Sequence, residues 1–291
     1  MPELPEVETV KTGLQRLLPG RIIISAVSDN PKSFPNATFD VEQFLYDATV
    51  TSVKRRAKVL LIELSSQYSL VIHLKMTGQL VFRSKDASFG AGHPNDSLIG
   101  ELPDRSTRVT LTFQDGSRLF FNDQRKFGWV RLLPTVEVPE LAFFKKVGPE
   151  PLELDFTWQL LWERLQRRKN TSIKAAILDQ TVLAGIGNIY ADESLWDAKI
   201  HPTTLVRNVT RRDIKKLHAA IQHVLQLSID SGGSSDKNYV DAEGRRGSYL
   251  TFANVFRREG QLCNRCGSTI IKTRVAGRGT HTCPVCQRPR N

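Results

Sequence analysis

The stretch CNRCGSTIIKTRVAGRGTHTCPVC (residues 263–286) contains all four cysteines of a chain of 291 residues. They form two CxxC pairs separated by sixteen residues: Cys263 with Cys266, and Cys283 with Cys286. This spacing is typical of a tetrahedral zinc site with four thiolate ligands, in which no position is open for catalysis. We therefore predict one structural Zn2+, with His281 as the alternative to one of the thiolates.

The residues between the two CxxC pairs predict a β-hairpin with a basic turn. TIIKTRV is rich in β-branched residues, and two glycines flank Arg278 at the expected turn. Residues 257–291 contain eight Lys and Arg against Glu259 alone, and so carry +7 of the chain's net charge of +11. Positive charge gathered on a small terminal module predicts contact with phosphates.

Upstream of this module, apolar residues recur at helical spacing. The pattern predicts helices over 156–166, 171–180, 189–199 and 210–230. Thr210 and Asp213 resemble a capping box at the start of the last helix. One face of that helix is apolar apart from its final serine: Ile214, Leu217, Ile221, Val224, Leu225 and Ser228. We expect a helical domain over 150–250, followed by the zinc finger over 251–291.

Two glycine-bearing segments adjoin these helices. AGIGNIYADE places Gly185 and Gly187 before a helix, whose first backbone N–H groups suit a phosphate, although such a turn also serves simple close packing. Residues 232–249 form a polar, glycine-rich loop of a length that is usually functional or disordered.

The first 134 residues are rich in β-type runs. These runs cover 21–29, 48–53, 58–64, 69–74, 107–113 and 117–121. The polar segment 84–104, which contains Gly and Pro, predicts a long mobile loop. We expect a β-sandwich domain over 1–134 and, together with the helical domain, an α+β fold.

The chain starts with MPELPEVETV, and the spacing of Val7, Val10 and Leu14 predicts a helix directly behind Pro2. Removal of Met1 would leave Pro2 as a free secondary amine. An α-amino group titrates near neutral pH, so a sizeable fraction is neutral in the cell and is a candidate nucleophile. No run approaches the roughly 20 apolar residues that span a bilayer, and the acidic start differs from a signal peptide. We expect a soluble, cytoplasmic protein.

Six motifs in chain order, together with the CxxC pairs, carry a family resemblance. PELPEVETV, RRAKVLLIEL, HLKMTGQL, NDQRKFG, GIGNIYADE and GGSSDKNYVDAEGRRGSY resemble the bacterial-type formamidopyrimidine-DNA glycosylases, collinearly from Pro2 to Gln287. The resemblance implies a base-excision repair enzyme that removes oxidised purines, such as 8-oxoguanine and formamidopyrimidines, from double-stranded DNA and then nicks the strand. It also implies a β-sandwich joined to a helix-two-turn-helix domain with a zinc finger.

The resemblance implies chemical roles for a few residues. The Pro2 nitrogen attacks the deoxyribose C1′, expels the base and forms an iminium ion that drives β- and δ-elimination. Glu3 serves as general acid and base, and Lys58 as a second catalytic cation. Arg278 clamps the phosphates that flank the lesion. Glu6 either assists this chemistry or only stabilises the first helical turn.

The resemblance also implies residues that hold the DNA. Met76, Arg125 and Phe127 match residues that fill the space left by the everted nucleotide. Lys169 and Asn188 match contacts to the DNA backbone, and the glycine-rich loop matches a lid over the everted base.

The chain departs from the family pattern at four places. Lys75 stands where the family often has glycine, and Ser106 stands where it usually has histidine. One phosphate contact is then weaker, or Arg105 supplies it. NVFRREG (254–260) replaces a more common Tyr-Gly-Arg pattern, and the segment 84–104 is longer than expected.

Two other functions are open. An endonuclease VIII-like enzyme for oxidised pyrimidines is disfavoured by the PELPE opening and by Arg125 and Phe127. A DNA-binding or scaffold protein without activity is disfavoured because Pro2, Glu3 and Lys58 are all present. In each case we expect a monomer.

Overall fold

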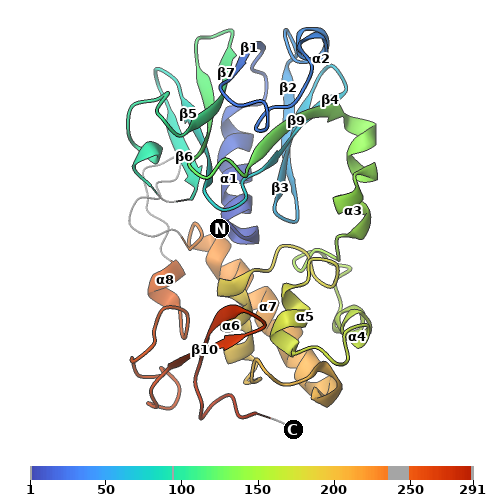
Figure 1. Cartoon of the computed structure of the whole chain (residues 1–291), viewed down its shortest axis with the longest axis vertical. Helices are drawn as coiled ribbons and strands as arrows, with labels where there is room; N and C mark the ends of the chain where they lie inside the picture. Colours follow the sequence, from blue (N-terminus) through green and yellow to red (C-terminus); the bar gives the residue numbers. More distant parts are fainter. Residues whose placement is uncertain (1, 94, 235–248, 290–291) are drawn as a thin grey trace. The chain divides into compact units, whose positions relative to one another are not determined.

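The computed structural model describes residues 2–93, 95–234 and 249–289, and Figure 1 shows their arrangement. The chain divides into two compact units. The first consists of Met1–Lys145 and Ser231–Ser248, and the second of Lys146–Asp230 and Tyr249–Asn291. Antiparallel sheets dominate the first unit, and helices with one hairpin form the second, so the predicted α+β fold is confirmed.

Two sheets form the first unit. One has the strand order β1-β7-β8-β5-β6, and the other has the order β2-β3-β4-β9. The strands are β1 (Ile23–Ser28), β2 (Val50–Arg56), β3 (Val59–Leu64), β4 (Tyr68–His73), β5 (Gly78–Arg83), β6 (Ser88–Gly92), β7 (Thr107–Phe113), β8 (Arg118–Asp123) and β9 (Trp129–Pro134). The sequence runs predict six of them and miss β5, β6 and β9.

Helix α1 (Leu4–Leu17) packs into this sandwich (Figure 1). Its apolar residues, among them Val10 and Leu14, share one hydrophobic core with Leu60 of one sheet and Phe121 of the other. Burying such a side chain stabilises the fold by about 1.5–3 kcal/mol. The apolar stripe of α1 thus determines where its N-terminus lies. The shorter helices of this part are α2 (Thr38–Phe44), η2 (Thr135–Glu140) and α3 (Ala142–Lys146).

The segment 84–104 is not the mobile loop that its composition predicts. It contains β6, which pairs with β5, and the short helix η1 (Asp96–Leu98). The glycines that suggest a loop are needed for close packing instead. A Cβ on Gly90 would lie 3.0 Å from the Leu98 carbonyl oxygen, and Gly92 has a φ of +124°.

The second unit contains the four predicted helices. They are α4 (Trp158–Gln166), α5 (Ile173–Leu178), α6 (Asn188–Asp197) and α7 (Arg211–Asp230), and the short helices η3 (Val206–Asn208) and α8 (Tyr249–Phe252) accompany them. The predicted face of α7 is buried from Ile214 to Ser228. Its capping box is also present, because Thr210 N donates to Asp213 Oδ2 at 3.1 Å and Asp213 N donates to Thr210 Oγ1 at 3.2 Å.

The predicted hairpin consists of β10 (Ile271–Val275) and β11 (Arg278–Thr282). Ala276 and Gly277 form its two-residue turn with φ of 47° and 75°. Arg278, predicted in the turn, is instead the first residue of β11, paired with Val275. Two successive positive φ angles characterise the type I′ turn, whose twist matches that of the strands it joins.

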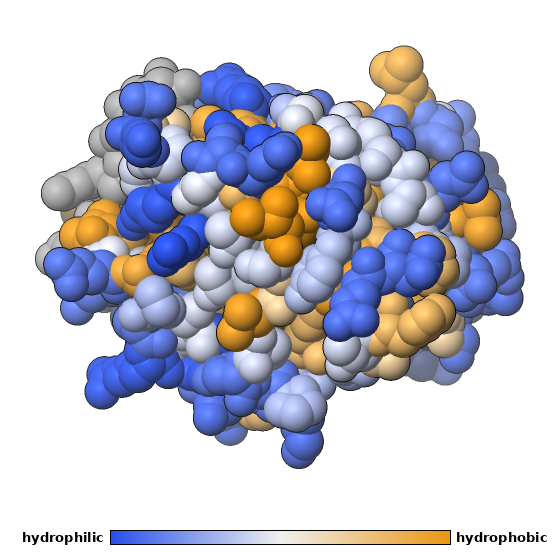
Figure 2. Space-filling view, turned by 90° about the horizontal axis from the view of Figure 1, so that it is seen from above, coloured by the Kyte–Doolittle hydropathy of each residue, from blue (hydrophilic) through white to orange (hydrophobic). Residues whose placement is uncertain are grey.

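Among the described residues, no helix is both long and apolar enough to cross a membrane. Figure 2 shows one face of the molecule, on which hydrophobic side chains form small patches between hydrophilic ones.

Candidate active site

Pro2 and Glu3 lie directly before α1, and both are buried. Glu3 is the N-cap residue of the helix and forms a capping box with Glu6, whose Oε2 accepts a hydrogen bond from Glu3 N at 2.7 Å. A capping box satisfies backbone donors that a helix leaves free at its start. The backbone next to the Pro2 nitrogen is therefore fixed by the helix.

The second carboxylate oxygen of Glu6 holds the start of the glycine-rich loop. Glu6 Oε1 accepts hydrogen bonds from Ser234 N at 2.8 Å and from Ser234 Oγ at 2.7 Å. Gly232 and Gly233 have φ of 75° and 89°, which turn the chain toward this carboxylate. Residues 235–248 of the expected lid lie outside the described residues. Glu6 thus does more than stabilise the first turn of α1.

Lys58 is buried at the tip of the β2–β3 hairpin, directly after Ala57. Arg55 ties this tip to α1, because its guanidinium donates to Glu8 Oε2 at 2.6 Å and to the Ala57 carbonyl at 3.0 Å. Burial raises the pKa of Glu8, but hydrogen bonds from Lys11 and Arg55 outweigh it and lower the pKa below its ordinary value. An ionised Glu8 therefore anchors the turn that carries Lys58.

His73 is a site residue that the sequence analysis misses. It lies on β4 opposite Val59, the neighbour of Lys58. Its Nδ1 accepts a hydrogen bond from Lys75 N at 3.0 Å, so the neutral ring carries its proton on Nε2. Burial, with the charges of Lys75 and Lys58, lowers the pKa of His73 to about 3. Pairing the predicted strands 58–64 and 69–74 would have placed it beside Lys58.

The three expected wedge residues are exposed: Met76 by 38%, Phe127 by 55%, and Arg125 beside it. The Arg125 guanidinium lies 4.9 Å from the centre of the Phe127 ring. The Thr77 hydroxyl joins the loop of Met76 to the loop of Arg125 and Phe127, because it donates to Asp123 and accepts from Arg125 N at 3.1 Å. The structure thus places the three residues that are predicted to form a wedge on one hydrogen-bonded support.

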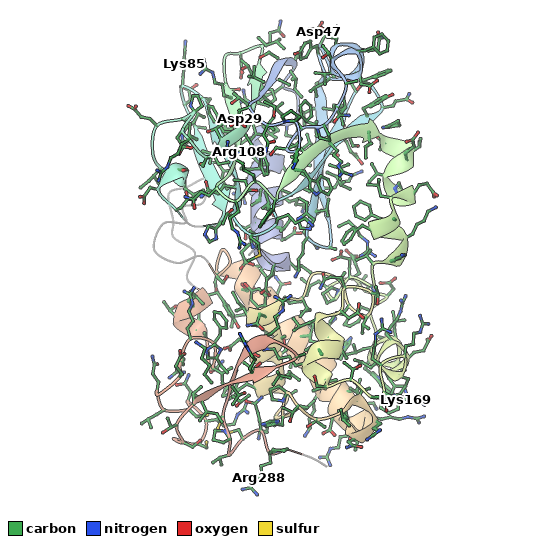
Figure 3. All side chains as sticks on the ribbon, in the orientation of Figure 1. Asp29, Asp47, Lys85, Arg108, Lys169 and Arg288 are labelled. Carbon is green, nitrogen blue, oxygen red and sulfur yellow. The ribbon has the colours of Figure 1, made fainter. Side chains whose placement is uncertain are left out.

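At Ser106, where the family pattern usually has histidine, the side chain is held inside the fold. Ser106 is buried, and its hydroxyl donates to Asp104 Oδ1 at 2.7 Å. Its neighbour Arg105 is exposed, and the Arg105 carbonyl accepts a hydrogen bond from Arg108. Arg108 also forms an ion pair with Asp29 (Figure 3). Arg105 therefore offers a guanidinium on a firmly held backbone.

In the second unit, Asn188 and Arg278 lie close together. Asn188 is the first residue of α6, and its Nδ2 donates to the Gly279 carbonyl at 3.0 Å, next to the exposed Arg278. Its Oδ1 is buried and has no partner among the described residues. Lys169 follows α4, and Figure 3 shows its side chain directed outward.

A buried ion pair, which the sequence analysis also misses, supports β11, the strand that contains Arg278 and Gly279. Lys174 on α5 and Asp192 on α6 have fully buried side chains, with Nζ and Oδ1 2.6 Å apart. Lys174 Nζ also donates to the Gly279 carbonyl at 3.0 Å and to Thr280 Oγ1 at 2.7 Å. The backbone of His281 donates to Asp192 Oδ2 at 3.0 Å. Two helices thus fix the strand that begins with Arg278.

A buried carboxylate fixes the connection between α8 and the finger. Glu193 on α6 accepts hydrogen bonds from the backbone N–H groups of Asn254, Val255 and Phe256 at 2.9, 2.9 and 2.8 Å. Burial raises the pKa of Glu193, although these hydrogen bonds oppose the rise. The NVFRREG departure therefore begins in a segment held to the helical core.

The four cysteines form one cluster, and all their sulfur atoms lie within 4.8 Å of one another. Cys263 and Cys286 Sγ are 4.0 Å apart, and Cys266 and Cys283 Sγ are 3.5 Å apart. A tetrahedral zinc ion with bonds of about 2.3 Å separates its sulfur ligands by about 3.8 Å, so the cluster fits one Zn2+. His281 packs against Asp192 instead, so the four cysteines, and not His281, form the metal-binding cluster.

Comparison with known proteins gives consistent results along the whole chain. Residues 1–130 match the formamidopyrimidine-DNA glycosylase N-terminal domain, residues 147–239 match its H2TH domain, and residues 260–289 match a zinc finger found in FPG and IleRS. The formamidopyrimidine-DNA glycosylase of Chloroflexus aurantiacus is 44% identical over 99% of this chain and 98% of its own. That of Pelotomaculum thermopropionicum is 41% identical over 99% of both chains.

Solved structures agree with these matches. A Lactococcus lactis FPG mutant bound to Fapy-dG containing DNA is 37% identical, with a TM-score of 0.86 over 99% of this chain and 100% of its own. The Lactococcus lactis Fpg bound to abasic-site DNA has the same identity and TM-score, over 98% of this chain and 99% of its own.

Proposed function

Because the chain belongs to the formamidopyrimidine-DNA glycosylase family, we propose that it excises oxidised purines from double-stranded DNA and then cleaves the abasic strand. The observation that carries the proposal is the placement of Pro2. It stands before the N-cap of α1, next to buried Glu3, in the same unit as Lys58 and the wedge residues. The solved relatives bound to Fapy-dG and abasic DNA support this substrate class.

The chemistry starts once Met1 has been removed. The Pro2 nitrogen attacks C1′ of the damaged nucleotide, and the bond between C1′ and the base breaks. Glu3 acts as general acid, protonating the sugar ring oxygen as the ring opens. The products are the free base and an iminium ion between Pro2 and C1′.

The iminium ion then cleaves the strand. It withdraws electrons from C2′, so a proton leaves that carbon and the 3′ phosphate is expelled by β-elimination. A second loss of a proton expels the 5′ phosphate by δ-elimination. Lys58 is the proton donor in the first elimination, and Arg278 binds the phosphates that flank the lesion.

The remaining site residues hold the DNA. Met76, Arg125 and Phe127 fill the space that the everted nucleotide leaves. Asn188 at the start of α6, Lys169 and the neutral Nε2–H of His73 bind backbone phosphates. The zinc ion supplies no chemistry; its four cysteines fasten the hairpin that carries Arg278.

An incision assay on a panel of lesions tests this function. We expect cleavage of duplexes containing 8-oxoguanine or a formamidopyrimidine opposite cytosine, and little cleavage of oxidised pyrimidines. Pro2→Gly should still bind an abasic-site analogue but should lose most excision. One solved Lactococcus lactis complex contains an oxidised pyrimidine, so pyrimidine lesions belong in the panel. Preferential cleavage of pyrimidine lesions would replace the purine assignment, and no cleavage of either class would leave only DNA binding.

A further inference from the structure

Lys75 has a backbone conformation that its residue type disfavours. Its φ is +51°, in the left-handed region, where a side chain costs free energy that glycine does not. The local turn requires this conformation, because Lys75 N donates to His73 Nδ1 and Gly78 N donates to the Leu74 carbonyl at 2.8 Å. A glycine would make the same turn without strain.

No contact within the described residues accounts for a lysine at this position. Its side chain is partly exposed, and it forms neither a hydrogen bond nor an ion pair with any described group. The folded protein therefore gains little from the ammonium group that would offset the strained backbone. Strained residues of this kind concentrate at functional sites.

The surroundings of Lys75 form a cationic corner beside the wedge. Met76 directly follows Lys75. The backbone N–H of Lys75 donates to Nδ1 of His73, so that Nε2 carries a proton. The ammonium groups of Lys58 and Lys75 both lie close enough to His73 to disfavour its protonated form. Two ammonium groups and one N–H donor in one place favour a tetrahedral oxyanion.

We propose that Lys75 binds a phosphate of the DNA backbone together with His73, next to the nucleotide that Met76 displaces. The inference rests on the proposed function, because it takes DNA as the ligand. It adds Lys75 to the groups that bind phosphate, and it explains why the chain has a lysine there despite the backbone strain.

Lys75→Gly separates binding from stability, because it removes the ammonium group and the strain together. Lys199→Gly is the matched control: Lys199 also has a positive φ, of 58°, is exposed, and follows α6 in the second unit. Both variants should unfold at the same urea concentration as the parent protein or at a higher one. Lys75→Arg should keep the DNA affinity.

The measurement is the dissociation constant for a duplex with an abasic-site analogue, determined at several salt concentrations. One phosphate contact contributes about −0.9 to the slope of log K against log salt, so Lys75→Gly should make this negative slope shallower by that amount and weaken binding about eightfold at 0.1 M salt. Lys199→Gly should change neither. An unchanged slope and affinity in Lys75→Gly would overturn the inference.

Undamaged duplex distinguishes failure of this inference from failure of the proposed function. A phosphate contact does not require a lesion, so the salt slope of Lys75→Gly should also become shallower on undamaged DNA. If the parent protein cleaves no lesion but this slope still becomes shallower, the proposed function fails and the phosphate contact stands. If cleavage is normal and the slope is unchanged on both duplexes, only the inference fails.

Discussion

At His73, burial next to two lysines keeps the imidazole neutral. Its pKa is lowered to about 3 by burial and by the charges of Lys75 and Lys58. Because Lys75 N already occupies Nδ1, Nε2 remains a hydrogen-bond donor throughout the physiological pH range. His73 thereby offers the proposed phosphate a hydrogen-bond donor without adding a third charge to the two lysines.

The same residue makes the stability of the fold depend on pH. Below its ordinary pKa of 6.5, His73 binds a proton in the unfolded chain but not in the folded chain until the pH approaches 3. The free energy of unfolding should therefore fall as the pH falls through this window. We expect His73→Gln to lose less stability between pH 7 and pH 4.5 than the parent protein, as measured by urea unfolding. Equal losses would show that His73 is not the group responsible.

At the scale of elements, the buried Lys174–Asp192 pair joins α5 and α6 to the strand that begins with Arg278. Removing one partner of a buried pair leaves an uncompensated charge and costs about 3–5 kcal/mol. Lys174→Met should lower the free energy of unfolding by that amount in urea. Lys174→Met combined with Asp192→Leu should recover part of the loss. A double variant less stable than the single one would contradict the role of the pair.

The zinc finger is the second element whose removal can be predicted. Cys266→Ser should bind less than one zinc ion per chain and lose affinity for DNA, because it removes one of the four ligands of the metal site that fastens the hairpin. Lowering the pH should release zinc from the parent protein, since cysteine thiols must lose their protons to bind metal and acid protonates them again. Metal content and binding to an abasic duplex measure both effects. Full affinity without zinc would refute the structural role.

The elements also show what sequence patterns can and cannot reveal. The face of α7 and its Thr210–Asp213 cap follow from local spacing and are confirmed. Strand β6 is missed because its glycines indicate a loop, whereas they serve close packing at Gly90. Lys174 and Asp192 are missed because residues eighteen positions apart meet only through the packing of two helices.

At the scale of the whole molecule, the net charge of +11 dominates the expected interaction with DNA. Five cations stand among the predicted and proposed site residues: Lys58, Lys75, Arg125, Lys169 and Arg278. If each neutralises one phosphate, log K should fall against log salt with a slope of about −4.5. Fluorescence anisotropy on a labelled duplex, at salt concentrations from about 50 to about 300 mM, measures this slope. A flat response would contradict a phosphate-binding surface.

The central claim is that the Pro2 amine is the nucleophile, and borohydride trapping tests it most directly. The protein is incubated with a duplex containing 8-oxoguanine opposite cytosine, reduced with borohydride and digested, and mass spectrometry locates the cross-linked residue. We predict a reduced adduct on the Pro2 nitrogen of a chain that has lost Met1. An adduct on a lysine side chain, or none while Met1 is absent and DNA binding is intact, would contradict the mechanism.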